Sequence, residues 1–146
     1  MAQFIGTTTI RKSAQDVFAV MSNPANDAKW SAAVIHGEWT SPGSPGIGST
    51  ARFVSKLFGR RLENVWEITE FERNVKFVAL SRTGPFPVEV TTAVSPVRGG
   101  TRVEVTYAME PRGIIRLAAP LLLGYGRRRL QEALDNLRGL MESGRL

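Results

Sequence analysis

The feature that most constrains the fold is a long run of alternating apolar and polar residues between Val34 and Met109. A period of two is typical of β-strands, because successive side chains of a strand point to opposite faces of a sheet. Glycine, proline and asparagine clusters interrupt the run at residues 41–48, 58–59, 72–74, 84–85 and 98–100. The breaks are short, so we predict about six strands that pair antiparallel with their sequence neighbours.

The alternation predicts one solvated face and one mainly apolar face of this sheet. Charged side chains such as Arg52, Glu63 and Arg102 alternate with apolar ones and define the solvated face. The apolar face also carries polar residues, which are Ser55, Asn64, Ser81, Thr92 and Tyr107. Polar groups need hydrogen-bond partners when they are buried, and a ligand or a water-filled cavity would supply them.

The segments on either side of this run have different patterns. Residues 4–10 predict a strand, and Ser13 is a plausible N-cap of a helix that ends near Asn23-Pro24. A second short helix is expected over residues 25–33, which include Trp30. This order, a strand and two short helices before the six strands, makes a mixed α+β fold.

The C-terminal third has helical periodicity. Its last part forms one apolar face with Leu130, Ala133, Leu134, Leu137, Leu140 and Met141. The first half is also apolar on the opposite side, at Ile114, Leu117, Leu121 and Tyr125. Either Pro120 turns this segment so that both sides are covered, or the side is exposed and serves as a cavity lid, an entrance or a dimer surface.

With these residues placed, the chain resembles the START-like superfamily with the helix-grip fold, and within it the polyketide cyclase/dehydrase-type proteins. The matching segments are residues 10–13 leading into Asp16-Val17-Phe18, Trp30 after Asn23-Pro24, Pro45 to Ser49, Trp66 to Phe71, Gly99 to Val103 and the apolar-then-basic C-terminal helix. The resemblance implies one domain over residues 1–146, in which a curved antiparallel sheet of about seven strands wraps around a long C-terminal helix. In such proteins the cavity between sheet and helix holds hydrophobic or amphipathic molecules.

We therefore predict that the cavity is lined from the sheet, from the second short helix and from the C-terminal helix. The expected lining residues are Trp30, Phe53, Asn64, Trp66, Phe77, Ser81, Phe86, Val88, Tyr107, Leu122, Leu123 and Gly126, and the expected lid is Ile114, Leu117, Leu121 and Tyr125. Tyr107 is the candidate for a polar group that touches the ligand. For catalysis Tyr107 is also the one candidate, and no acid or base is assigned beside it, since the inward positions of the strands offer neither a carboxylate nor a lysine.

The residue content excludes several kinds of chemistry. The chain has no cysteine and a single histidine, His36, so thiolate nucleophiles and Cys- or His-rich metal sites are excluded and no metal or cofactor is expected. The glycines at 43, 46 and 48 precede no helix, and no P-loop or nucleophile elbow is present. The N-terminus does not resemble a secretory signal, which favours a cytoplasmic protein.

Three functions remain open. The first is binding of a hydrophobic or aromatic small molecule of a lipid-, polyketide- or quinone-like kind. The second is a polyketide-type cyclase or dehydratase. The third is contact with RNA, the ribosome or a membrane through a basic surface, since the net charge is +6 and Arg127-Arg128-Arg129 are adjacent.

Overall fold

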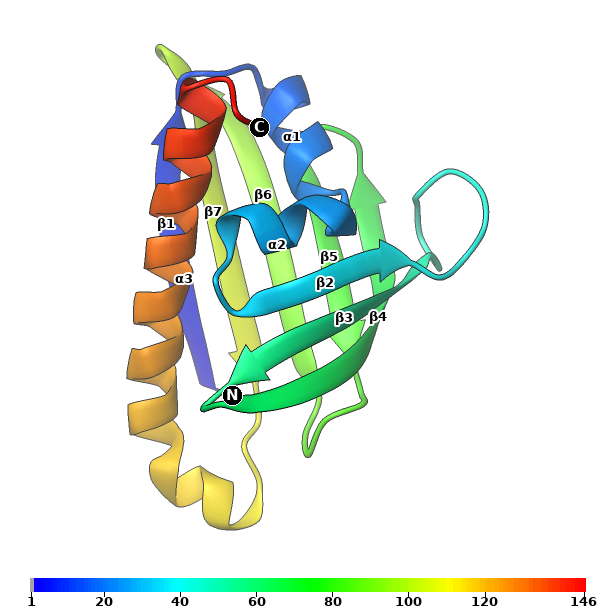
Figure 1. The fold of residues 1–146 in the computed structure, drawn as a ribbon, viewed down its shortest axis with the longest axis vertical. Coiled ribbons are helices and arrows are strands. Elements are labelled where there is room, and N and C mark those ends of the chain that lie inside the picture. The colour runs from blue at the N-terminus through cyan, green and yellow to red at the C-terminus, as the bar shows by residue number, and fades with distance from the viewer. Residues whose placement is uncertain (1) are drawn as a thin grey trace.

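Seven strands form one antiparallel sheet in the computed structural model, which describes residues 2–146. They are β1 (Ala2–Ile10), β2 (Val34–Trp39), β3 (Thr50–Leu57), β4 (Arg60–Glu72), β5 (Lys76–Ser81), β6 (Val88–Val97) and β7 (Gly100–Met109). The strand order is β1-β7-β6-β5-β4-β3-β2, so strands β2 to β7 each pair with their sequence neighbours and β1 pairs with β7. The predicted curved antiparallel sheet is confirmed (Figure 1).

Two short helices follow β1, as predicted. Helix α1 (Ala14–Met21) begins at Ser13, whose Oγ accepts a hydrogen bond from the Asp16 backbone N–H at 3.1 Å. The second helix is shorter than the predicted 25–33: a 3-10 turn η1 (Pro24–Asn26) leads into one turn of helix α2 (Asp27–Trp30). The chain becomes extended at Ser31 because Val34 already pairs with Ser55 in the sheet, and tertiary pairing overrides local helix propensity.

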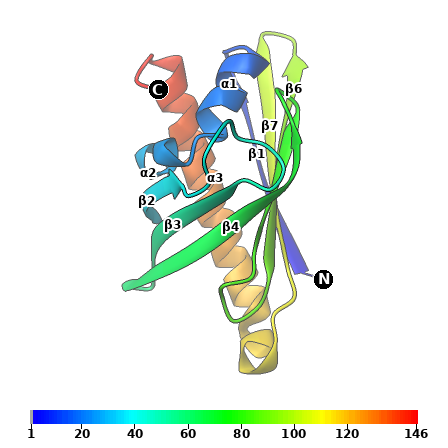
Figure 2. The same ribbon diagram turned by 90° about the vertical axis from the view of Figure 1, so that its right-hand side faces the viewer.

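Helix α3 (Ala119–Glu142) lies along the concave side of the sheet, and α1 and α2 cover the same side next to it (Figures 1 and 2). Five residues of the predicted apolar face are buried, Leu130, Ala133, Leu134, Leu137 and Met141, and the sixth, Leu140, is partly buried against the core. The helix approaches β1 closely at Gly6, where an added Cβ would lie 2.8 Å from Leu130 Cγ. A glycine at this position therefore allows the helix to pack against the edge of the sheet.

Pro120 interrupts the C-terminal segment in the way its chemistry requires. Residues before it form a 3-10 helix, η2 (Gly113–Ala118), and Pro120 lies in the first turn of α3. Proline is tolerated there because the first N–H groups of a helix have no intrahelical acceptor. At the place where a kink was expected, the chain therefore changes from the 3-10 helix η2 to the α-helix α3, which starts at Ala119.

The convex face of the sheet is less uniformly solvated than predicted. Val54 and Val78, each on the face opposite the helices, are only 3% exposed. Val54 pairs across the strands with His36 and Glu63, and it shares its face with Arg52. Cross-strand side chains on one face lie within contact distance, so the long polar chains around Val54 cover it.

Candidate functional site

Two buried polar atoms without partners lie on helix α2. Among the described residues, Asp27 Oδ1 and Trp30 Nε1 have no hydrogen-bond partner, and both atoms are inaccessible to solvent. The two residues are three positions apart, which places their side chains on the same side of a helical turn. Leaving a buried polar atom unpaired costs about 1–3 kcal/mol, so two in one turn mark an unusual position.

The surroundings of Asp27 change its acid–base behaviour. Burial raises the pKa of its carboxyl from 3.8 to about 8. The carboxyl is therefore largely protonated at neutral pH, because desolvation disfavours the charged form. A protonated carboxyl can both donate and accept a hydrogen bond, whereas the indole N–H of Trp30 only donates.

Tyr107 of β7 belongs to the same group of polar residues. Burial raises the pKa of its hydroxyl to about 12, and the nearby Asp27 carboxylate adds to this rise. The Tyr107 ring stacks on Phe4 of β1, with ring centroids 4.8 Å apart and an angle of 8° between the planes. Gly126 of α3 lies against this pair, since an added Cβ there would be 2.7 Å from Phe4 Cζ. The carboxyl, the indole and the phenol are thus associated on the concave side of the sheet, close to α3.

Asp27 is the residue that sequence reasoning missed. The inward positions of the strands, where alternation identifies the inner face, hold no carboxylate. The spacing to Trp30 could have indicated it. Residues three positions apart lie on the same side of a helix, so Asp27 faces the core if Trp30 does. The burial of Asp27 itself depends on how α2 packs against the sheet and α3.

Seven of the twelve predicted cavity residues fall into three separate neighbourhoods. Trp30, Tyr107 and Gly126 belong to the neighbourhood just described. Asn64 and Ser81 form a second one through Thr83, whose hydroxyl lies 3.3 Å from Asn64 Oδ1 and 3.0 Å from Ser81 Oγ. These two polar residues therefore have protein partners and do not need a ligand to satisfy them.

The third neighbourhood lies under helix α1 and the turn η1. Phe77 packs edge-on against Phe18, with ring centroids 5.7 Å apart, and forms part of the core there. Phe53 lies below Gly37, where an added Cβ would meet its ring at 2.6 Å. The remaining predicted cavity residues are half-buried and are Trp66, Phe86, Val88, Leu122 and Leu123.

Two hollows on the surface of the described residues lie outside this interior. An open groove of about 490 Å³ is lined by Ile5, Gly124, Arg127, Arg128 and Gln131, between β1 and α3. A smaller one of about 210 Å³ lies over strands β5, β6 and β7 and is lined by Leu80, Pro87, Glu89, Ala108, Glu110 and Arg112. No residue of the predicted cavity lines either hollow. The cavity between the sheet and the C-terminal helix therefore stays a prediction.

Three residues of the predicted lid are exposed, and the fourth makes a contact. Ile114, Leu117 and Leu121 lie 79–86% exposed, which excludes the alternative that Pro120 turns this side of the segment inward. Tyr125 stacks on Phe58 at the tip of the β3–β4 hairpin, with ring centroids 5.0 Å apart. Phe58 has a positive φ of 50°, which costs energy for a bulky residue and is commonly associated with functional sites.

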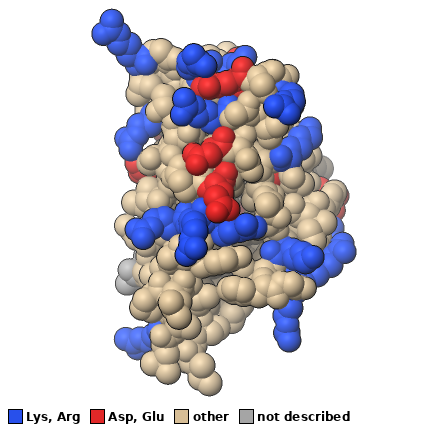
Figure 3. Space-filling model, turned by 60° about the vertical axis from the view of Figure 1, so that its left-hand side comes forward, with Lys and Arg blue, Asp and Glu red and all other residues tan. Residues whose placement is uncertain are grey.

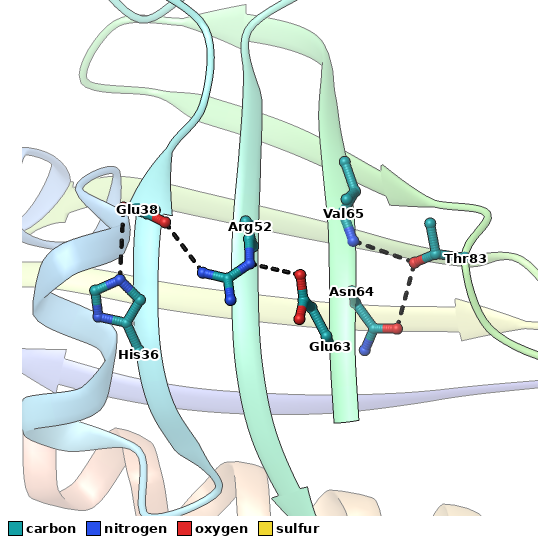
Figure 4. A network of polar contacts seen from close by, with 7 residues as sticks. All are labelled: His36, Glu38, Arg52, Glu63, Asn64, Val65 and Thr83. Atoms are coloured by element: carbon teal, nitrogen blue, oxygen red, sulfur yellow. Dashed lines mark hydrogen bonds and ion pairs between the residues drawn. The ribbon is translucent and has the colours of Figure 1, made fainter. Parts of the chain in front are cut away.

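His36 lies away from all of these residues, in a polar network on the convex face (Figure 4). Its Nε2 is 3.6 Å from Glu38 Oε2, and its side chain is 53% exposed. Arg52 links Glu38, at 3.1 Å, to Glu63, at 2.6 Å. This ion-pair chain ties β2, β3 and β4 together and has no connection to Asp27.

Solved structures with the same fold are numerous. TTHA0849 from Thermus thermophilus is 19% identical, with a TM-score of 0.80 over 94% of this chain and 95% of that one. A START superfamily protein from Mycobacterium smegmatis is 14% identical, with a TM-score of 0.68 over 92% of this chain and 98% of its own. The di-domain ARO/CYC protein BexL, from the BE-7585A biosynthetic pathway, is 14% identical with a TM-score of 0.75; the match covers 97% of this chain and 48% of BexL.

These likenesses, all below 20% identity, show the fold alone. Ara h 8.0201 has it too, with 14% identity and a TM-score of 0.62 over 93% of this chain and 97% of its own. No curated protein matches the sequence. None of the helices within residues 2–146 has the length and apolarity needed to cross a bilayer. Residues 1–142 match the family described as "Polyketide cyclase / dehydrase and lipid transport", and the chain belongs to that family.

Proposed function

We propose that the protein binds an apolar small molecule with an oxygen function, between the concave face of the sheet and helix α3. The observation that carries the proposal is the pair of buried, unpartnered polar atoms, Asp27 Oδ1 and Trp30 Nε1. A ligand carbonyl or hydroxyl oxygen accepts a hydrogen bond from the indole N–H and another from the protonated Asp27 carboxyl. The Phe4–Tyr107 stack offers an aromatic surface to the rest of the molecule.

Access to this interior requires movement at one end of α3. The Phe58–Tyr125 contact joins the β3–β4 hairpin tip to α3, so its separation would open the space between hairpin and helix. Gly124 and Gly126 lower the local stability of the helix next to Tyr125, by about 1 kcal/mol each relative to alanine. The predicted lid therefore acts in this proposal through Tyr125 and the first turns of α3.

A pair of probes tests whether the polar atoms recognise an oxygen. We expect the protein to bind 2-naphthol about tenfold more tightly than naphthalene, because one well-placed hydrogen bond contributes about 1.4 kcal/mol. Isothermal titration calorimetry measures both affinities. In Asp27→Asn and Trp30→Phe the preference for 2-naphthol should shrink, whereas in Trp39→Phe, a half-buried tryptophan of β2, it should persist. Equal affinity for the two probes, or binding of neither, would contradict the proposal.

A second candidate function is acid catalysis on such a ligand, of the cyclase or dehydratase kind. The observation that favours it is the pKa of Asp27 near 8, which provides a proton donor at neutral pH beside the interior. In this function Asp27 would donate its proton to a carbonyl or departing hydroxyl oxygen, while a solvent water accepts the proton lost from the neighbouring carbon. Tyr107 would stay neutral and hold the same oxygen by a hydrogen bond.

Enolisation of a simple ketone tests this second function separately from binding. We expect the protein to accelerate the exchange of the α-hydrogens of 2-tetralone in D₂O, followed by NMR, and Asp27→Asn to abolish the acceleration. Unchanged exchange in Tyr107→Phe would remove Tyr107 from the mechanism. If 2-naphthol binds with the expected preference but 2-tetralone exchange is not accelerated, catalysis is contradicted and the binding proposal stands.

A further inference from the structure

One end of the molecule exposes large apolar side chains. Ile114 is 86%, Leu117 85%, Leu121 79% and Phe58 66% exposed, and we call these four residues the apolar end. Three of them lie on η2 and the first turn of α3, which extend beyond the ends of the strands (Figure 1). Single exposed apolar residues are ordinary, but several at one end of a molecule are typical of an interaction surface.

The chain around the apolar end is strongly basic. Residues 111–131 contain five arginines and no carboxylate, and Arg60 and Arg61 follow Phe58 in the hairpin. Figure 3 shows a band of Lys and Arg across the face that bears α3, above a lower end that is largely uncharged. The positive charge therefore borders the apolar end.

Helix geometry connects the apolar end to a groove that contains two of these arginines. Leu121, Gly124, Arg128 and Gln131 follow each other at intervals of three and four residues, which places them on one side of α3. The last three line the open groove of about 490 Å³, together with Arg127 and Ile5. Neither Arg127 nor Arg128 has an ion-pair partner among residues 2–146. Arg128 lies seven positions after Leu121, which corresponds to about 10 Å along the helix.

We propose that this end of the molecule docks on an anionic membrane surface. The apolar end enters the boundary between headgroups and acyl chains, and Arg127 and Arg128 bind lipid phosphates from the groove. Leu121 and Arg128 are about 10 Å apart along the axis of α3. Apolar faces of interfacial helices insert to a depth of about 5–10 Å, so the arginines lie at headgroup level when α3 meets the membrane with its first turn. Anionic headgroups then supply the negative charge that residues 111–131 lack. The proposal is independent of whether Asp27 and Trp30 bind a ligand.

The two other occupants of such a surface fit less well. A symmetric contact with a second copy would bring two patches of the same positive net charge together. A nucleic acid would pair with the arginines but leave the three most exposed side chains, Ile114, Leu117 and Leu121, without apolar partners. A lipid surface satisfies both kinds of residue.

Co-sedimentation with vesicles tests the proposal. We expect binding to phosphatidylcholine vesicles that contain phosphatidylglycerol, much weaker binding to phosphatidylcholine alone, and weakening with salt. Leu117→Asp/Leu121→Asp should lower the affinity at least about tenfold, because the inserted apolar area is lost. Arg127→Gln/Arg128→Gln should lower it about thirtyfold, since each basic residue near an anionic leaflet contributes roughly a fivefold factor.

Matched variants remote from the apolar end serve as controls, and all variants are first checked for native circular dichroism and thermal unfolding. Ile47→Asp/Val97→Asp places two aspartates at other exposed apolar positions, and Arg73→Gln/Arg98→Gln removes two exposed arginines from strand turns. Both should bind vesicles as the unmodified protein does. Equal binding to neutral and anionic vesicles, or wild-type binding by Leu117→Asp/Leu121→Asp, would overturn the proposal.

Two further outcomes would reassign this surface. A dimer in light scattering that Leu117→Asp/Leu121→Asp dissociates, without any vesicle binding, would assign it to a second copy. Salt-sensitive RNA binding that depends on Arg127 and Arg128 but not on the leucines would assign it to nucleic acid. Either result would show that membrane docking is wrong.

Discussion

Asp27 is the residue whose environment departs most from what its type prefers. Its carboxyl is desolvated on α2, and no arginine or lysine of the described chain forms an ion pair with it. An acid in this environment is neutral at physiological pH, which makes it a hydrogen-bond donor as well as an acceptor. This single residue supports both the binding of an oxygen-containing ligand and proton transfer to it.

The raised pKa of Asp27 predicts a pH-dependent stability. Between about pH 4 and pH 8 the unfolded chain loses this proton while the folded protein keeps it. The folded state then binds more protons, so this residue lowers the free energy of unfolding as pH rises through that range. Asp27→Asn should remove the effect, and its stability relative to the unmodified protein should be greater at pH 8 than at pH 5.

Urea denaturation at the two pH values measures the difference. Asp16→Asn, which removes an exposed carboxylate from α1, is the matched control for loss of an acidic side chain. If the free energies of unfolding of Asp27→Asn and the unmodified protein differ by the same amount at both pH values, the pKa of Asp27 is not raised in the folded protein.

At the scale of elements, the packing of α3 against β1 depends on two glycines. A larger residue at either position would have to displace neighbouring side chains. Gly6 on the strand faces Leu130 and Leu134, and Gly126 on the helix faces Phe4. The Phe4 ring cannot move freely away from Gly126, since it is stacked on Tyr107. The close approach of helix and strand therefore also fixes the aromatic pair beside Asp27 and Trp30.

Two glycine-to-alanine substitutions in α3 should change stability in opposite directions. Gly139→Ala should raise the free energy of unfolding by about 1 kcal/mol, because alanine favours a helix and an added Cβ meets nothing within 4 Å. Gly126→Ala gains the same propensity, but its Cβ would lie 2.7 Å from Phe4 Cζ, and overpacking costs typically about 1–3 kcal/mol. We expect a net loss for Gly126→Ala in urea denaturation. An equal rise in the free energy of unfolding for both variants would show that the Phe4 ring moves aside at little cost.

At the scale of the whole molecule, Glu142 joins the two ends of the chain. Its Oε2 accepts a hydrogen bond from the Arg11 backbone N–H at 2.9 Å, and its Oε1 lies 3.4 Å from the Arg11 guanidinium. Arg138 approaches the same carboxylate at 3.5 Å. The contact fastens the end of α3 to the segment between β1 and α1, which closes the helix against the sheet.

This contact predicts a pH dependence opposite in sign to that of Asp27. The backbone hydrogen bond from Arg11 lowers the pKa of Glu142, with the charges of Arg11 and Arg138 contributing. A lowered pKa stabilises the fold above the ordinary value of 4.5, and the stabilisation is lost as pH falls through the folded value. Glu142→Gln should therefore be less stable than the unmodified protein at pH 7 and approach it as pH falls below 4.5.

Thermal unfolding over this pH range measures the effect. Glu132→Gln, which removes an exposed partner of Arg129 on the same helix, is the control and should change stability less, because exposed ion pairs contribute little. A stability gap for Glu142→Gln that does not depend on pH would contradict the role given to its charge.

Local patterns were sufficient to predict the order of elements and the family. The alternation from residue 34 to 109 predicts the six strands, and the spacing of Leu130, Leu134 and Leu137 predicts the buried face of α3. Both patterns have a short period that a few neighbouring residues reveal, which explains why they can be read without a structure. The side chain of Ser13 is likewise a local signal, and it caps α1 as expected.

The candidate site was decided by contacts between residues distant in sequence. Asp27 became an acid of raised pKa only because α2 packs on the concave side of the sheet near Tyr107, eighty positions later in the chain. Thr83 satisfies Asn64 and Ser81 across strands, which no local period indicates.

The sequence by itself thus determined the strands, the helices, the faces of α3 and the family, since these follow from the periodicity and residue types of contiguous segments. The tertiary structure alone decided which polar groups lose water without gaining a partner and which apolar side chains stay exposed. Desolvation and exposure depend on everything that surrounds a group in space, and the elements around Asp27 come from both halves of the chain.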